Sequence, residues 1–293
     1  MTLLTTILQD SELTGIETAY VPFLPQMSVC DLAEIPLESG SAPAEVFLCG
    51  FTLRNTTDEA FDYPILPDTC SSLVFRQAGR RMEGWFCGTA DCLRKLRLKQ
   101  GERFTVLRFR PGNSRVPFIG DLSAVTNRAL RLGSDYPEGA GLLEIMEQDL
   151  SDEEKVRLLT EALQETRLQK ESVQLFRYCT GLIIRTNGSI RISELAANTG
   201  FSERYIGKLF ERMTGLSPKL YSETIRMQHA VRRIRNREEQ KSLLELSMDC
   251  GYFDHAHMNR EFNKFLKCSA GNLRRKGFAV IDRDLIEPYV DRT

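Results

Sequence analysis

The stretch ANTGFSERYIGKLF, residues 197–210, joins the end of one amphipathic segment to the start of another through a glycine and a serine. Gly200 tolerates the positive φ that a sharp turn after a helix requires, and the side-chain oxygen of Ser202 can cap a new helix. The apolar residues after this turn recur at helical spacing and mark one buried face; they are Ile206, Leu209, Phe210 and Met213. With ISELAANT (192–199) as the first helix, the stretch predicts a helix-turn-helix whose second helix turns its solvated face outward.

A similar pattern follows in MDCGYFDHAHMNREF, residues 248–262. A shift of 52 residues aligns the two outward-facing helices, whereas a shift of 51 carries Gly200 onto Gly251, so the second turn is one residue longer. The segment between the copies, 218–236, begins with a proline and predicts a connecting helix about 27 Å long. We therefore expect two recognition helices in successive major grooves of one DNA face, about 34 Å apart.

Charge is distributed unevenly along the chain. The 293 residues carry a net charge of −1, yet residues 181–278 hold 18 lysines and arginines against 10 acidic residues. Lysine and arginine side chains that neutralise phosphates release condensed counterions, so a basic segment is typical of nucleic-acid binding. A solvated cationic face is the alternative that charge alone would leave open.

Residues of about 173–276 resemble the DNA-binding domain of the AraC/XylS family of transcription regulators. The motifs that carry this resemblance are Leu195-Ala196, the turn glycine Gly200, Ser202-x-x-x-Ile206-x-x-x-Phe210, Gly215-x-Ser217-Pro218 and the spacing from Arg226 to Ala230. The resemblance implies a regulator that binds promoter DNA as a duplex, with activation the commoner outcome and RNA polymerase a candidate partner. It also implies a cupin-like sensor domain before the helices.

The second copy departs from the family pattern after its recognition helix. Lys267 and Ala270 stand where the family usually has Gly-x-x-Pro, and Leu273 replaces the usual tyrosine. We expect the fold to survive with a strained or reshaped helix exit. If this change abolished DNA contact by the second copy, the domain would be an interaction module with one reading helix, which is an alternative interpretation.

The candidate DNA-contacting residues fall on the solvated faces of the two recognition helices. Arginine and lysine can donate to guanine, and asparagine suits adenine. The expected base readers are Arg204 and Lys208 in the first copy, and His255, Asn259 and Arg260 in the second. Residues farther along are expected to grip phosphates, which positions the protein without specifying a sequence; they are Arg212, Lys264, Arg274 and Arg275. A solvated surface charge is the alternative for each.

Two other features of these helices are ambiguous. Tyr205 can face outward or complete the buried stripe. His255 and His257 form an HxH pair, but positions i and i+2 of a helix point to different faces, so a metal site is not predicted there. The sequence predicts no metal, no cofactor and no catalytic residue.

The first 125 residues or so are β-rich, which makes the chain α+β. Short segments rich in Val, Phe, Leu and Thr are separated by turn formers; they are residues 44–53, 71–77, 82–88 and 102–110. A sandwich or small barrel is predicted. The expected domains are a β-rich sensor or effector domain at 1–135, a helical connector at 136–172, the DNA-binding domain at 173–278 and a tail at 279–293.

The connector region contains helical patterns. Ser151 and Glu154 match a capping box, and apolar stripes follow it; the stripe residues are Val156, Leu159, Leu163, Leu175, Cys179, Leu182 and Ile183. Such stripes can join domains, form a homodimer contact, or pack within one domain. The sequence leaves these alternatives open.

The β-rich part offers little catalytic chemistry. All three histidines, at 229, 255 and 257, lie beyond residue 228, which disfavours a His-ligated metal or a His-activated nucleophile in the first domain. Arg108 and Arg110 alternate onto one strand face and either bind an anionic effector or pair with acids such as Asp68. Trp85 either contacts a ligand or fills the core.

The eight cysteines are too sparse for a disulfide scaffold. Only Cys87 and Cys92 lie close in sequence; they pack in the core or form a redox switch. A DNA-binding domain fused to a cysteine-based DNA-repair or redox-sensing module is therefore the rival function. The opening MTLLTTILQDSELTG matches neither a secretory signal nor a membrane span. The sequence thus predicts a cytoplasmic, dimeric, non-enzymatic transcription regulator that senses an unknown small molecule.

Overall fold

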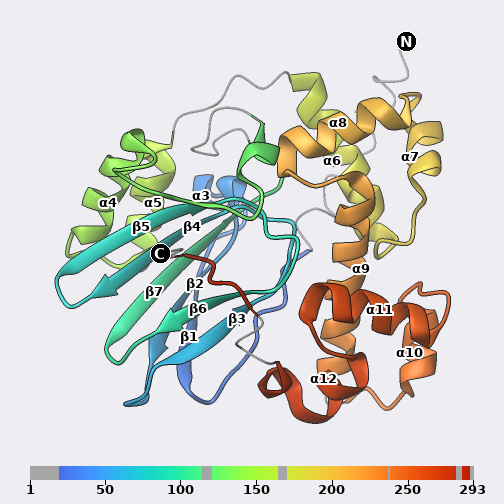
Figure 1. Ribbon diagram of the computed structural model, residues 1–293. Coiled ribbons are helices and arrows are strands. Elements are labelled where there is room, and N and C mark those ends of the chain that lie inside the picture. Colours follow the sequence, from blue (N-terminus) through green and yellow to red (C-terminus); the bar gives the residue numbers. More distant parts are fainter. Residues whose placement is uncertain (1–19, 114–120, 164–169, 237, 282–285, 291–293) are drawn as a thin grey trace.

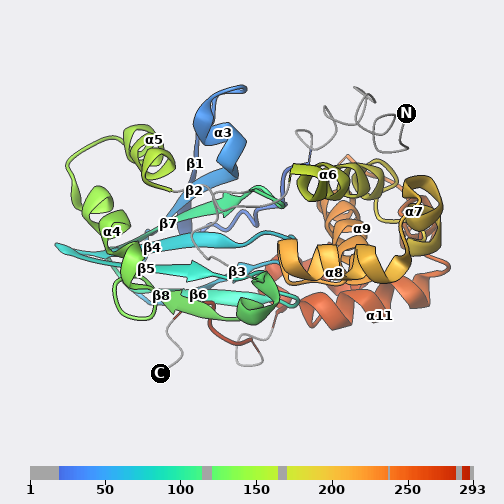
Figure 2. The same ribbon diagram turned by 90° about the horizontal axis from the view of Figure 1, so that it is seen from above.

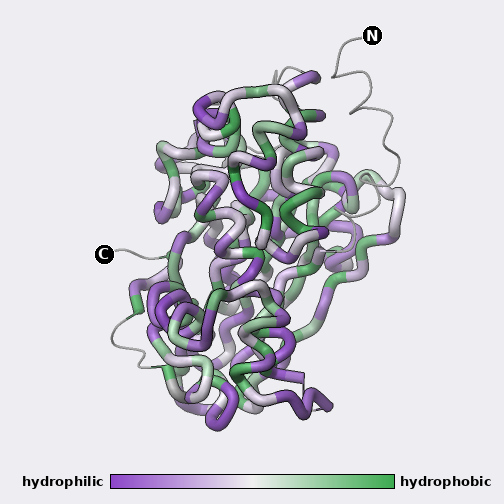
Figure 3. Tube along the Cα trace, turned by 90° about the vertical axis from the view of Figure 1, so that its right-hand side faces the viewer, coloured by the Kyte–Doolittle hydropathy of each residue, from purple (hydrophilic) through white to green (hydrophobic). Residues whose placement is uncertain are grey.

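The computed structural model describes residues 20–113, 121–163, 170–236, 238–281 and 286–290. Two domains lie side by side in Figures 1 and 2: a β domain (residues 20–163) and a helical domain (residues 170–281). The predicted α+β class is confirmed. In Figure 3, hydrophobic and hydrophilic residues alternate along the helices and strands, as two-sided elements require.

The β domain is built from two antiparallel sheets. The larger sheet has the strand order β1-β2-β7-β4-β5-β8, and the smaller one pairs β3 with β6. The strands are β1 (Cys30–Ile35), β2 (Phe47–Asn55), β3 (Phe61–Ile65), β4 (Ser72–Ala78), β5 (Arg81–Cys87), β6 (Arg94–Leu98), β7 (Glu102–Phe109) and β8 (Ala129–Arg131). The predicted β-rich segments correspond to β2, β4, β5 and β7, whereas β1, β3, β6 and β8 were not predicted.

Alternation along the strands of the larger sheet creates two cores. On β4, Val74 belongs to the cluster shared with β3 and β6, while Leu73 and Phe75 belong to the cluster beneath the helices of this domain. On β7, Val106 and Leu107 divide in the same way. Successive side chains of a strand point to opposite faces, so one central sheet supports both layers.

Short helices cover the outer face of the larger sheet. They are α3 (Ala42–Val46), α4 (Ala140–Glu147) and α5 (Asp152–Ala162), with 3₁₀ turns at Leu122–Val125 (η1) and Pro137–Gly139 (η2). The Ser151–Glu154 capping box that begins α5 is confirmed. The strand predicted at 44–53 was wrong at its start, because Ser41 caps a helix with Pro43 in its first turn and extended structure begins only at Phe47.

The helical domain contains two units of the same build. Its helices are α6 (Lys170–Arg185), α7 (Ile192–Thr199), α8 (Glu203–Thr214), α9 (Pro218–Arg235), α10 (Leu243–Asp249), α11 (His255–Leu266) and α12 (Ala270–Lys276), followed by the 3₁₀ turn η3 (Gly277–Val280). The predicted shift of 52 residues carries both ends of α8 onto those of α11. Seen from above in Figure 2, α8 and α11 lie on one side of α9 and α6 lies on the other.

The apolar stripes predicted between residues 156 and 183 pack within the chain. Val156, Leu159 and Leu163 belong to the core beneath the large sheet, and the α6 stripe belongs to a core formed with α8 and α9. The helices of the region 136–172 therefore divide between the two domains. Residues 164–169, which separate α5 from α6, lie outside the described residues.

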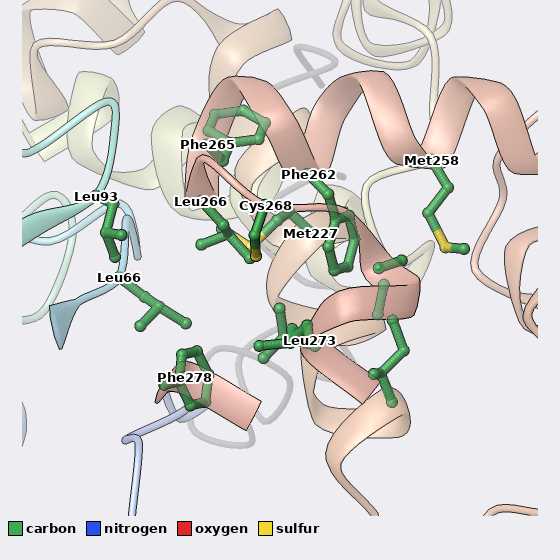
Figure 4. Close-up of a cluster of buried hydrophobic side chains, with 14 of the residues drawn as sticks. Leu66, Leu93, Met227, Met258, Phe262, Phe265, Leu266, Cys268, Leu273 and Phe278 are labelled. Atoms are coloured by element: carbon green, nitrogen blue, oxygen red, sulfur yellow. The ribbon is translucent and has the colours of Figure 1, made fainter. Parts of the chain in front are cut away.

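The two domains share hydrophobic cores. Figure 4 shows Leu66 and Leu93 of the β domain in the cluster that contains Phe265, Leu266 and other residues of the helical domain. A second shared cluster joins residues of the β domain to α6, α8 and α9; the β-domain members are Tyr20, Leu48 and Cys70.

The last described segment, 286–290, returns to the β domain. The backbone N–H of Tyr289 donates to the carbonyl of Lys95 at 2.8 Å, and the Lys95 N–H donates to Glu287 at 3.2 Å, so this segment extends the edge at β6. Tyr289 is buried between the two sheets, where its hydroxyl lies 3.3 Å from Ser72 Oγ. Part of the region predicted as a tail, 279–293, therefore completes the first domain.

Candidate nucleic-acid interface

Each recognition helix begins and ends at a defined cap. The hydroxyl of Ser202 accepts the Tyr205 N–H at 3.2 Å at the start of α8, and the Asp254 carboxylate accepts the His257 N–H at 2.5 Å at the start of α11. Helix α7 ends at Gly200, whose φ is 72°, the positive value that the predicted turn requires. These side-chain acceptors satisfy backbone N–H groups that a helix start leaves without intrahelical partners.

Amphipathic sequence fixes which face of each helix is exposed. The stripe predicted in α8 is buried, and its counterpart in α11 is buried as well; the two stripes are Ile206, Leu209, Phe210 and Met213, and Met258, Phe262, Phe265 and Leu266. The face opposite each stripe is left to solvent. The helices α8 and α11 themselves lie on the same side of the connecting helix α9 (Figure 2).

Exposed cations recur at equivalent places on the two faces. Lys208 and Arg212 of α8 correspond, at the 52-residue shift, to Arg260 and Lys264 of α11, and all four residues are exposed. Arg204 is also exposed, near the start of α8. The repeat places positive charge one helical turn apart on the outward faces of both helices.

Some candidate phosphate contacts already have protein partners. The Lys264 ammonium lies 2.6 Å from Glu223 of α9, which offsets part of its charge. Arg274 donates to the carbonyls of Lys241 and Glu239 at 2.7 and 3.1 Å, and so fastens the loop that precedes α10. Arg275 donates to its neighbour Asn272 at 2.7 Å.

Asn259 is engaged inside the second unit. Its Oδ1 accepts the Ala270 N–H at 3.1 Å, and its Nδ2 lies 3.2 Å from Nε2 of His255. The first unit has Pro218 at the position of Ala270, and proline has no N–H to satisfy. The alanine at the position of the family's proline thus supplies a backbone N–H that donates to Asn259. In the sequence, this replacement is the only sign of the hydrogen bond.

The ambiguous aromatic and histidine residues have defined places. Tyr205 is 42% exposed and stacks on Phe201 with ring centroids 5.0 Å apart, so the alternative that it completes the buried stripe was wrong. His257 lies 3.3 Å from Glu261 and edge-on to Tyr252. His255 instead faces Asn259, as expected for positions that do not share a helix face.

A buried ion pair fixes α11 on α9. Arg226 donates to both carboxylate oxygens of Glu261 at 2.6 and 3.4 Å and to the Gly188 carbonyl at 3.2 Å. Burial opposes the charged guanidinium, but the hydrogen bond and charge of Glu261 raise the pKa of Arg226. The sequence pattern included Arg226 only as part of a motif. Glu261 stands where the first unit has Leu209 of the buried stripe, and a carboxylate at a buried position was the signal that it needs a partner.

The exit from α11 is strained, as the departure from the family pattern predicted. Lys267 takes the left-handed conformation with φ 56° and ψ 23°, whereas Gly215 holds the equivalent place in the first unit with φ 75°. A side chain in this region costs free energy that glycine avoids. The cap hydrogen bond still forms, from the Lys267 N–H to Asn263, so the fold is retained.

The two candidate effector arginines of the β domain have partners within that domain. Arg108 Nε lies 2.9 Å from Asp68 Oδ2, and both side chains are buried. Asp68 also accepts the Cys70 N–H at 3.1 Å. The alternative that Arg108 pairs with Asp68 is confirmed. Arg110 follows the end of β7 and donates to the Ala44 carbonyl at 2.8 Å, which corrects its expected place on the strand face.

The cysteines do not form a reactive site. Cys87 is buried and Cys92 half-buried, and both thiols are free. Burial raises the pKa of each above the usual range, and it raises the pKa of the Cys30 and Cys268 thiols to about 11. The thiolate is the nucleophile in cysteine chemistry, so these environments disfavour the redox-switch and DNA-repair alternatives.

The paired caps and the buried stripes of α8 and α11 define a helical domain with two helix-turn-helix units. Residues 195–276 match the family described as "Helix-turn-helix domain". No curated protein matches the chain in sequence. None of the helices in the described residues is long and apolar enough to cross a membrane.

Solved structures similar to the chain include crystal structures of ToxT from Vibrio cholerae. One, from strain O395, has a TM-score of 0.40 and 10% identity over 77% of this chain and 95% of that chain. Another, in the P21 form, has a TM-score of 0.40 and 9% identity over 77% and 97%. ToxT bound to (E)-4-(8-methylnaphthalen-1-yl)but-3-enoic acid has a TM-score of 0.38 and 10% identity over 85% and 96%. At these scores, function has to be argued from the residues of this chain.

Proposed function

We propose that the protein is a sequence-specific transcription regulator that binds promoter duplexes through α8 and α11 and senses a small molecule through its β domain. The repeat of exposed cations at Lys208 and Arg212, and again at Arg260 and Lys264, carries the proposal. A regularly repeated cationic face on two helices held by one connecting helix fits successive grooves of a duplex. Arg204 adds a further donor at the start of the first reading helix.

The roles of the predicted contacts differ within this proposal. Arg204, Lys208 and Arg260 reach base edges, and Arg212 and Lys264 contact phosphates. Asn259 and His255 shape the exit of the second unit through their mutual contact and the Ala270 N–H. A base contact by Asn259 would use its Nδ2, because Oδ1 already accepts a hydrogen bond within the protein.

A homodimer, contact with RNA polymerase, activation of transcription, a cupin-like sensor and a cytoplasmic location belong to the same proposal, and the family resemblance supports them. The apolar stripes of α5 and α6 pack within the chain. A dimer would therefore use another surface than these stripes.

The main test maps bound DNA across a genome and then measures affinity for the best site. Arg204→Ala and Lys208→Ala should each weaken that site by about 1–3 kcal/mol, which is about 5- to 150-fold. Arg80→Ala is the control, because it removes one positive charge at an exposed turn of the β domain. This variant should leave the affinity for DNA unchanged. Unchanged occupancy of every site by Arg204→Ala would remove the reader role of that residue.

Footprinting separates two reading helices from one. The intact protein should protect two successive helical turns, and Arg260→Ala should weaken protection of one of them. Protection of a single turn by the intact protein would favour the interaction-module alternative, in which α11 does not contact DNA.

A further inference from the structure

A cavity of about 330 Å³ opens in the β domain between β5, the start of β6, the loop around β8 and the C-terminal segment 286–290. Trp85 and Tyr289 supply aromatic surface to its wall. The two side chains are largely buried in the core between the sheets, so only part of each reaches the cavity. The same segment that completes the β domain therefore also forms one wall of this cavity.

The cavity wall carries excess positive charge. Arg94, Arg128 and Arg131 line it against a single carboxylate, Asp135, which itself accepts the backbone N–H of Arg131 at 3.0 Å. Guanidinium groups match the planar geometry of carboxylate and the oxygens of phosphate. This composition fits a small anion with an apolar or aromatic part.

The buried arginine of this wall has unused hydrogen-bonding capacity. The Arg94 side chain is only 6% exposed, and its Nη1 pairs with Glu287, which is mostly exposed. Its Nε, fully buried, has no partner among the described residues. A buried polar atom without a partner costs free energy, which a ligand oxygen or an ordered water would recover.

The second arginine of the wall shares its carboxylate with other cations. Arg131 pairs with Glu83, which also pairs with Arg76 and Arg81. Burial would raise the pKa of Glu83, but the hydrogen bond and charge of Arg76, with the charges of Arg131 and Arg81, hold it below the usual range. Three guanidinium groups against one carboxylate leave a positive excess beside the cavity. Arg128 is exposed, and within the described part of the chain its guanidinium has one long hydrogen bond, 3.4 Å, to the Ala124 carbonyl.

We propose that this cavity binds a small organic oxyanion, with Arg94, Arg128 and Arg131 holding the carboxylate or phosphate and Trp85 and Tyr289 contacting its apolar part. The inference deepens the proposed function, because it places the sensing site of the β domain. Its ligand would be recognised by charge and by an aromatic wall, in contrast to the buried Arg108–Asp68 pair, whose charges are already matched.

Sequence neighbours of two cavity residues contact the C-terminal ends of both recognition helices. Arg94 follows Leu93, whose N–H donates to the carbonyl of Phe265 in α11 at 2.9 Å. Asn127, another cavity residue, follows Thr126, whose hydroxyl donates to the Gly215 carbonyl at the end of α8 at 3.0 Å. A residue of the cavity therefore stands next in sequence to each of these two contacts.

The two contact loops are also tied to each other. Asn127 Oδ1 accepts the Asp91 N–H at 3.1 Å, and the Asn127 N–H donates to the Thr89 carbonyl at 3.0 Å. The contact with α8 is close, because a Cβ on Gly215 would lie 2.1 Å from Thr126 Oγ1. An anion that draws Asn127, Arg128 or Arg94 toward the cavity thus acts on both reading helices together.

Trp85 is the only tryptophan of the sequence, so the tryptophan fluorescence of the protein comes from one residue, which lies at the wall of this cavity. Phenylacetate is the carboxylate probe, phenylacetamide is its uncharged counterpart, and inorganic phosphate is the oxyanion without a ring. Chloride keeps the ionic strength constant throughout. We expect phenylacetate to change the emission saturably below about 10 mM, phosphate to act more weakly and the amide to have no effect.

Matched variants locate the response. The double variant Arg128→Gln with Arg131→Gln should weaken phenylacetate binding at least about tenfold, and Arg80→Gln, an exposed arginine on the turn between β4 and β5, should not. Circular dichroism checks that the double variant is folded. No response to either oxyanion, an equal response to the amide, or full binding by the folded double variant would each overturn the site.

A second measurement tests the coupling to DNA. Phenylacetate should change the affinity of the intact protein for its duplex by at least about threefold, and the folded double variant should lose this change. A saturable Trp85 response with unchanged duplex affinity would overturn the coupling. If the protein bound the anion but no duplex, the proposed function would be refuted and the anion site would be supported. If it bound a duplex but showed no response to the anion, the anion site would be refuted and the DNA-binding role would be supported.

Discussion

Gln228 of α9 is buried at the domain interface and uses both ends of its amide there. Its Nε2 donates to the Pro67 carbonyl at 2.6 Å, and its Oε1 accepts the Phe23 N–H at 2.9 Å. Gln228→Leu keeps most of the side-chain volume and leaves these two backbone groups without their partner. Each such group costs about 1–3 kcal/mol, and Phe23 is only partly buried, so we expect a loss of about 2–4 kcal/mol in the free energy of unfolding.

Urea denaturation measures this loss, and Gln240→Leu in the exposed loop after α9 is the control, expected to stay within about 0.5 kcal/mol of the parent. Hydrogen exchange adds a local readout, since the Phe23 amide should exchange faster in Gln228→Leu. A loss below about 0.5 kcal/mol, with the Phe23 amide as protected as before, would refute the reasoning that these bonds hold the domains together.

Three further changes test other parts of the structure. Lys267→Gly should raise the free energy of unfolding by about 0.5–1 kcal/mol, because it relieves a left-handed side chain; a lower thermal midpoint would contradict this. Arg226→Met should cost about 3–5 kcal/mol by leaving Glu261 buried without its partner, and Glu261→Gln in the same background should recover part of it, as chemical denaturation would show. Glu83→Gln should cost about 1–2 kcal/mol at neutral pH. Since the folded pKa of Glu83 is lowered, its contribution is complete above the ordinary glutamate pKa and disappears as pH falls through the lowered value; a difference between the variants that persists in acid would count against this.

The helical domain could be predicted from the sequence because its signals are local. Caps such as Ser202 and Asp254 lie within three residues of the N–H groups that they satisfy, and a buried stripe repeats with the helical period. The strained exit at Lys267 was predictable for the same reason, since one residue type decides the cost of a left-handed turn.

The unpredicted strands depend on contacts between distant parts of the chain. β3 contains a proline and β6 alternates cations with leucines, so neither has the pattern of a strand buried on both faces. They form the smaller sheet because they pair with each other and cover the alternating side chains of β4 and β7.

The sequence predicted which candidate site residues are exposed, but it did not predict their contacts within the protein. Helix phase placed Arg204, Lys208 and Arg260 on exposed faces, as the structure shows. The partner of Asn259 is eleven residues away across a turn, and that of Arg226 is thirty-five residues away on another helix. Pairings of this kind follow from tertiary packing, which residue spacing does not determine.

The return of residues 286–290 to the β domain limits how the protein can be recombined with others. A chain cut after residue 278 would keep both helix-turn-helix units, yet it would remove Tyr289 from between the two sheets, and loss of a large buried aromatic side chain costs about 3–5 kcal/mol. A chimaera that joins these helices to another sensor domain would still carry residues 286–290, but it would lack β6, the strand with which this segment pairs. The two domains are therefore not independent units, because the segment that follows the helical domain is part of the β domain.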